Sequence, residues 1–269
     1  MKLDKYLELN INSRADFHAH TNRCDGHNTA EEMMRSAADR GLKVFGLSEH
    51  GYTPYDDSYC MSPEGQAAYE AEVRALSEQY AGQLEVLCGV EQDCLAGKPG
   101  RDWDYVIGSV HYIDCTPEGG SIIAIDESRE IWLDIVDRYF GGDVYAMFER
   151  YYETEAMVVE MTGADVIGHF DLITKYNAGG EGGCKGTLFD EGHPRYVAAW
   201  QKAAAKMLQT GVPLEINTGG MTRGYRTDTY PARPICDYIA AHGGRFILSS
   251  DSHSTESLCS EFERYRQYL

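Results

Sequence analysis

The sequence predicts an α/β barrel of parallel strands, and three observations lead to this prediction. Seven short apolar runs with β-forming residues recur along the chain, at residues 14–20, 43–50, 84–93, 104–112, 164–171, 212–220 and 245–253. Helical patterns separate most of these runs, and this alternation is typical of a parallel sheet covered by helices. The 269 residues match the size of one barrel, and no linker divides them, so we expect a single domain over residues 1–269.

The helical patterns between the runs have recognisable ends. Thr29 and Glu32 form a capping-box pattern at the start of the first helix, and Gly41 ends it. Further helical patterns cover residues 62–80, 126–161, 193–210 and 231–243. The glycine-rich segment 177–186 follows the fifth run, and because strand and helix patterns continue after it, we interpret it as a mobile loop at the barrel mouth.

Composition and charge exclude several classes of protein. The formal net charge of −19 argues against binding to a nucleic acid, so we expect a small-molecule substrate. No apolar run approaches the ~20 residues of a membrane span, and the first residues lack the apolar core of a secretory signal. We therefore expect a cytoplasmic protein whose eight dispersed cysteines are reduced thiols. The oligomeric state is not predicted.

Polar residues that can bind metals lie at or just after the ends of six of the seven apolar runs. In a parallel barrel these ends share one face, where catalytic residues gather. Residues two apart in a strand point to the same side, so the first two histidines can bind one metal, and the last pair repeats that spacing. The residues are His18, His20, His50, Glu91, His111, His169, Asp251 and His253.

A simpler interpretation exists for each of these residues alone. A single histidine at a strand end is more often a hydrogen-bonded structural residue, and Glu91 or Asp251 alone could cap a helix or form an ion pair. The joint pattern favours a metal centre, because independent coincidences would not place so many metal-binding side chains on one face. Imidazole and carboxylate ligands suit zinc, manganese or iron.

The sequence resembles the polymerase and histidinol phosphatase (PHP) superfamily, and within it the monofunctional histidinol-phosphate phosphatases. The similarity lies in DFHAHTNRCDGH, GLKVFGLSEHG, GVEQD, DYVIGSVHYI, DVIGHFDL, LEINTGG and SSDSH, which span Asp16 to His253. The resemblance implies a distorted (β/α)7 TIM-like barrel with two or three divalent ions at its C-terminal mouth. It adds Asp25 to the ligands named above, with His27 as a rival, and it implies an outer position for Glu49.

The resemblance also implies an activity, the hydrolysis of L-histidinol phosphate. Metal ions would neutralise the phosphate and supply hydroxide, Glu91 would bridge ions, and Asp251, His253 or a water would protonate the leaving alkoxide. Phosphate-binding candidates are Lys175, Arg223 and Arg226, with Arg226 preferred, although each could be a solvated loop charge.

Three other functions compete with this hypothesis. The same site could hydrolyse another small phosphate ester or a nucleotide. A non-catalytic metal-binding module is disfavoured because the ligand set looks complete. A nuclease conflicts with the acidic charge balance.

Overall fold

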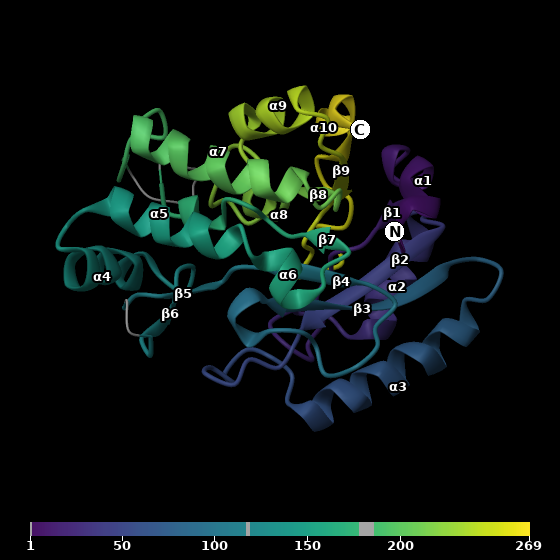
Figure 1. The fold of residues 1–269 in the computed structure, drawn as a ribbon. Helices are drawn as coiled ribbons and strands as arrows, with labels where there is room; N and C mark the ends of the chain where they lie inside the picture. The colour runs from purple at the N-terminus through teal and green to yellow at the C-terminus, as the bar shows by residue number, and fades with distance from the viewer. Residues whose placement is uncertain (1, 117–118, 178–185) are drawn as a thin grey trace.

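Seven parallel strands form a nearly closed barrel surrounded by helices in the computed structural model, which describes residues 2–116, 119–177 and 186–269 (Figure 1). All neighbouring strands of the barrel pair in parallel, which confirms the predicted α/β barrel. In order around the sheet the strands are β1 (Ala15–Asp16), β2 (Val44–His50), β3 (Glu85–Asp93), β4 (Val106–Ser109), β7 (Val166–Ile167), β8 (Leu214–Asn217) and β9 (Phe246–Ser249).

The first and last strands are joined at both ends. Beyond the strand ends, Ala19 pairs with Ser252 in a parallel bridge, and the His20 N–H donates to the Ser252 carbonyl at 2.8 Å. At the other end the Asn10 side chain accepts from the Leu248 N–H at 2.8 Å and donates to the Leu248 carbonyl at 2.8 Å. It also donates to the Ala15 carbonyl at 3.0 Å. The Asn10 amide therefore provides hydrogen bonds of the kind a neighbouring strand would make.

Helices follow most strands, as the sequence predicted. They are α1 (Leu7–Ile11), α2 (Ala30–Asp39), α3 (Pro63–Gln79), α4 (Arg129–Phe140), α5 (Val144–Glu155), α6 (Val158–Thr162), α7 (Pro194–Leu208), α8 (Gly219–Thr222), α9 (Arg233–Ala241) and α10 (Phe262–Tyr265). The capping box at the start of α2 is confirmed: Thr29 accepts from the Glu32 N–H, and the Glu32 side chain accepts from the Thr29 N–H. Ser62 caps α3 in a similar way, accepting from the Gly65 N–H.

The region 126–161 is divided into three helices. Gly141 ends α4 in the left-handed conformation, with φ of +58°, and Asp143 then caps α5 by accepting from two backbone N–H groups. A short antiparallel hairpin of β5 (Tyr112–Asp114) and β6 (Ile122–Ala124), which sequence periodicity did not predict, lies beside α4 and α5 (Figure 1). Most of the predicted glycine-rich loop, residues 178–185, lies outside the described residues.

Aromatic side chains fill the barrel interior below the strand ends. The Tyr105 ring lies against β2 and β3 at glycines, and a Cβ at Gly46 or Gly89 would come within 2.2 Å or 2.3 Å of its atoms. The Tyr105 hydroxyl donates to the Phe17 carbonyl, and both residues are buried. This filled interior leaves the carboxyl ends of the strands as the open end of the barrel.

Two further sequence predictions concern membrane-spanning helices and the pairing of cysteines. Among the described helices, none has the length and apolar character needed to cross a membrane. The seven cysteines in the described part of the chain are free.

Candidate metal centre and active site

The carboxyl ends of the parallel strands bring the predicted ligands together. His50 is the last residue of β2 and Glu91 lies in β3, while the other ligand candidates at strand ends follow β1, β4, β7 and β9 by two to four residues. His18 and His20 lie on one side of the extended chain after β1, with their Nε2 atoms 3.1 Å apart, as the two-residue spacing predicted.

The sequence placed Asp251 and His253 in the last strand. This expectation was wrong, because β9 ends at Ser249. Asp251 and His253 do not continue β9, and Asp251 has a positive φ of +47°. Their side chains nevertheless reach the same cluster, with His253 Nδ1 3.6 Å from Asp251 Oδ1. A turn of the backbone, and not strand alternation, brings this pair to the site.

The Glu91 carboxylate lies at the centre of the cluster and is almost fully buried. Ser109 Oγ also donates to Glu91 Oε1 at 2.6 Å. Each carboxylate oxygen faces ring nitrogens at 2.8–3.4 Å: Oε2 faces His18, His20 and His50, and Oε1 faces His111 and His169. One carboxylate in contact with five imidazoles can bridge two neighbouring cations.

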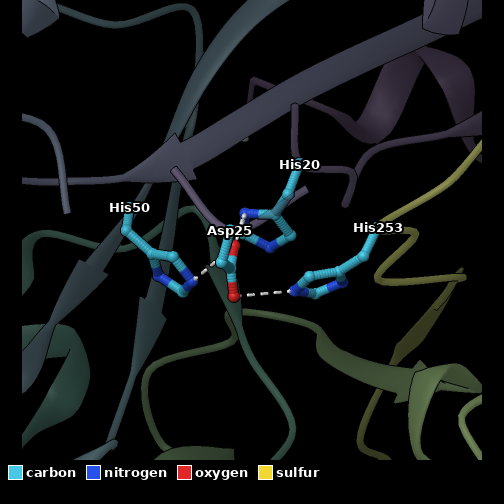
Figure 2. A group of neighbouring side chains, drawn as sticks. All are labelled: His20, Asp25, His50 and His253. Carbon is cyan, nitrogen blue, oxygen red and sulfur yellow. Dashed lines mark hydrogen bonds and ion pairs between the residues drawn. The ribbon is translucent and has the colours of Figure 1, made fainter. Parts of the chain in front are cut away.

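Asp25 lies at the outer side of this cluster, where Figure 2 shows its carboxylate among three imidazole rings. Its oxygens lie 3.1 Å from His253 Nε2, 3.7 Å from His50 Nε2 and 3.9 Å from His20 Nδ1. The rival ligand His27 is exposed and belongs to none of the metal-binding groups among the described residues. The geometry therefore favours Asp25 over His27.

Three overlapping groups of side chains have donor atoms within 4.8 Å of one another. They are His20, Asp25, His50 and His253; His18, His20 and Glu91; and His50, Glu91 and His111. Buried ring nitrogens without a hydrogen-bond partner also occur here, namely Nδ1 of His20, His111 and His169. A buried polar atom without a partner is costly, so the donor chemistry fits divalent metal ions, and so does His20 Nδ1, which faces Asp25 without a hydrogen bond.

Opposite charges outweigh burial in setting the pKa values of Glu91 and His18. Burial alone would raise the pKa of Glu91, but the surrounding histidines, His18 foremost, hold it well below its usual range. Burial likewise opposes the charged form of His18, yet the carboxylates of Glu215 and Glu91 raise its pKa well above the usual value. Burial and the neighbouring His253 lower the pKa of His20. The site thus favours ionised carboxylates, the form that binds metals.

A cavity of about 370 Å³ opens beside the cluster. The ligand candidates on its wall are Asp25, His50, Glu91, His111, His169, Asp251 and His253. The remaining lining residues include Asp56, Tyr59, Tyr112, Asp126, Glu127, Lys175, Arg223, Tyr225 and Tyr230. This volume is sufficient for a small organic molecule.

Two of the three predicted phosphate-binding residues reach this cavity. Arg223 donates to the Asp251 carbonyl at 2.7 Å and to Asp251 Oδ2 at 2.9 Å. Lys175 donates to the Asp126 carbonyl at 2.7 Å. The preferred candidate, Arg226, does not line the cavity: its guanidinium is buried and pairs with Glu191 at 2.9 Å. The geometry therefore favours Arg223 and Lys175.

Sequence reasoning missed Glu215, a fully buried carboxylate in β8. Its Oε1 lies 2.6 Å from His18 Nδ1. The sequence feature that could have identified Glu215 is its charge, which stands inside the apolar run LEIN. Glu49, for which an outer position was expected, belongs to none of the metal-binding groups among the described residues. It accepts from the Thr21 N–H at 2.7 Å, and burial raises its pKa to about 8.

The fold and the site define a class, the parallel barrels with an imidazole and carboxylate cluster at the carboxyl ends of their strands. Within it, the chain belongs to the PHP family, because the PHP domain model matches residues 16–219. A protein of Deinococcus radiodurans named "Probable histidinol-phosphatase" is 30% identical over 253 residues, which cover 88% of this chain and 85% of that protein.

Two solved structures share the fold. A protein described as a histidinol phosphatase from Listeria monocytogenes has a TM-score of 0.77 and 19% identity, covering 93% of this chain and 99% of that one. Histidinol phosphate phosphatase from Lactococcus lactis, complexed with zinc, L-histidinol and phosphate, has a TM-score of 0.63 and 17% identity, covering 95% and 92%. At these identities the structures support the distorted barrel fold alone.

Proposed function

We propose that this protein is a metal-dependent phosphatase that hydrolyses L-histidinol phosphate to L-histidinol and phosphate. The main support for a hydrolytic reaction is the convergence of nine imidazole and carboxylate side chains beside one cavity. The substrate is supported by the relatives named histidinol-phosphatase, from Deinococcus radiodurans and others.

The centre holds two or three divalent ions, of zinc, manganese or iron. Three overlapping donor groups support this number, since His20, His50 and Glu91 each belong to two of them. His169 and Asp251 complete the ligand set. His169 Nε2 lies 2.8 Å from Glu91 Oε1, and Asp251 Oδ1 lies 3.6 Å from His18 Nε2. When bound, such ions neutralise phosphate oxygens and lower the pKa of water so that hydroxide forms near neutral pH.

The chain's own residues bind and orient the ester. Arg223 lies against Asp251 and His253 on the cavity wall, where its guanidinium can donate to a phosphate oxygen. Lys175, paired with Asp126, adds a second positive charge to the cavity lining. His253 or a water beside Asp251 then gives a proton to the departing alkoxide.

The outer wall of the cavity is acidic and aromatic, which suits a cationic substrate. Tyr59 and Tyr112 lie face to face there, with ring centroids 6.0 Å apart, and the Tyr112 hydroxyl donates to Asp56. Asp126 and Glu127 add two more carboxylates to this wall. Carboxylates and aromatic faces both attract cations, and L-histidinol phosphate carries an ammonium group and an imidazole.

The test is a panel of phosphate monoesters assayed with the purified protein and added manganese, iron or zinc. We expect kcat/KM for L-histidinol phosphate to exceed that for p-nitrophenyl phosphate. Equal kcat/KM values for the two esters with all three metals would contradict L-histidinol phosphate as the substrate. A higher kcat/KM for another ester would identify that ester as the substrate. No phosphate release from any ester would contradict the phosphatase function itself.

A further inference from the structure

Glu215 hydrogen-bonds to two of the predicted metal ligands at once. Its Oε1 lies 2.6 Å from His18 Nδ1, and its Oε2 accepts from the His169 backbone N–H at 3.1 Å. Oε2 also accepts from Asn217 Nδ2 at 3.2 Å, and the same Nδ2 donates to Asp251 Oδ2 at 3.2 Å. Glu215 is 1% exposed. One buried carboxylate in β8 is thus linked to ligands that follow β1, β7 and β9.

We infer that Glu215 is the positioning residue of the metal centre, and this inference rests on the proposed function. Its role is to fix the tautomer of His18. When Nδ1–H donates to Glu215, the lone pair of Nε2 points toward Glu91 and Asp251, whose oxygens lie 3.2 Å and 3.6 Å away. Nε2 is then free to bind an ion, as expected for a metal-binding histidine held by a carboxylate.

Only a carboxylate satisfies all the donors around this position. His18 Nδ1–H approaches one oxygen, and both the His169 N–H and the Asn217 amide approach the other. In Glu215→Gln the amide NH₂ must face one of these two sides. Toward His169 and Asn217 it meets other donors; toward His18 it favours the tautomer with the proton on Nε2, which blocks metal binding.

The chain offers a matched control for this substitution. Glu155 is also fully buried, and its carboxyl group accepts from the Tyr151 hydroxyl at 2.9 Å. It belongs to none of the metal-binding groups in the described residues. Glu155→Gln therefore makes the same side-chain replacement in a buried position outside these groups.

The experiment measures zinc affinity by competition with a chelator for the parent, Glu215→Gln and Glu155→Gln. We expect Glu215→Gln to bind zinc about 10- to 100-fold more weakly, with hydrolysis recovering at excess zinc, and Glu155→Gln to match the parent. Affinity within threefold of the parent, or an equal loss in Glu155→Gln, would overturn the assignment. A parent that binds no divalent ion would overturn the proposed function and the assignment with it.

A measurement on the parent protein keeps the assignment testable if Glu215→Gln does not fold. Nitrogen NMR of the zinc-loaded protein reports which ring nitrogen of each histidine carries a proton. We expect His18 to be protonated on Nδ1, with the shift of a hydrogen-bonded donor. Protonation of His18 on Nε2 would show that Glu215 does not set the tautomer.

Discussion

Arg223 and Arg226 stand three residues apart in one loop, but their guanidinium groups have different surroundings. Arg223 lies on the cavity wall beside Asp251 and His253, whereas Arg226 is buried against Glu191 and the Thr174 carbonyl. Sequence reasoning could not separate them because spacing does not indicate which side chain a loop turns inward. Contact with phosphate is therefore expected of Arg223.

Replacing each arginine by Met tests this distinction. A charged hydrogen bond to an anion contributes roughly 1.5–3 kcal/mol, so Arg223→Met should lower kcat/KM for the phosphate ester by about 10- to 100-fold at saturating metal. Arg226→Met should leave kcat/KM within about twofold and instead lower the melting temperature, because it leaves Glu191 without its ion pair. The opposite pattern in kinetics and thermal melting would return Arg226 to the site.

Glu155 gives a prediction for stability against pH. Burial holds the pKa of the Glu155 carboxyl well above its usual range, so the folded state keeps a proton that the unfolded chain releases above about pH 4.5. The free energy of unfolding therefore falls, by up to about 1.4 kcal/mol per pH unit, as pH rises from there through the folded-state pKa. Glu155→Gln has no such proton to lose and should gain stability relative to the parent over this range.

Urea unfolding of both metal-free proteins at pH 5, 6 and 7 measures the difference. We expect the advantage of Glu155→Gln to grow with pH. The exposed residue Glu78 serves as the control, and Glu78→Gln should show no such trend. A difference between Glu155→Gln and the parent that does not change with pH would mean that the buried carboxyl is already ionised.

At the scale of elements, capping and breaking residues carried most of the predictive information. The Thr29 capping box gave the start of α2, and the patterns at 62–80 and 193–210 match α3 and α7 to within a few residues. The pattern at 126–161 concealed two interruptions, since apolar periodicity continues across the Gly141–Gly142 break while the backbone does not. The hairpin β5–β6 was missed because its strands have three residues each.

Gly141→Ala tests the break between α4 and α5. Gly141 has φ of +58°, and a Cβ there would meet nothing within 4 Å, so any cost comes from the left-handed backbone alone. We expect a loss of roughly 1–2 kcal/mol in the free energy of unfolding, measured with urea. Gly100→Ala, in similarly open space without a positive φ, should change it by less than about 0.5 kcal/mol. Equal effects would exclude the conformational explanation.

At the scale of the whole molecule, the sequence predicted the barrel and the edge at which the metal-binding candidates meet. Residues at the carboxyl ends of parallel strands must lie near one another, because all these ends lie at one rim of the barrel. What could not be predicted is how the barrel closes and how the ligands are supported. Asn10 and Glu215 act through partners 238 and 197 residues away, and no local pattern records such contacts.

Closure of the barrel gives its own prediction. Asn10→Ala removes the side chain that pairs with both backbone groups of Leu248 and with the Ala15 carbonyl. These groups would be left buried without partners, so we expect a loss of roughly 2–4 kcal/mol in the free energy of unfolding. Asn12→Ala, which removes one exposed hydrogen bond to Glu8, is the control. A loss no larger than in that control would show that Asn10 does not hold β1 and β9 together.

We propose that side chains from separate strand ends form one metal centre that hydrolyses a phosphate ester. The most direct measurement strips the purified protein of metal, titrates manganese, iron or zinc back, and follows bound metal and phosphate release from L-histidinol phosphate together. We expect activity to appear only as two or three ions bind per chain, and Glu91→Gln to lower both bound metal and phosphate release. Full hydrolysis by the stripped protein, or a stoichiometry below one that no added metal raises, would contradict this proposal.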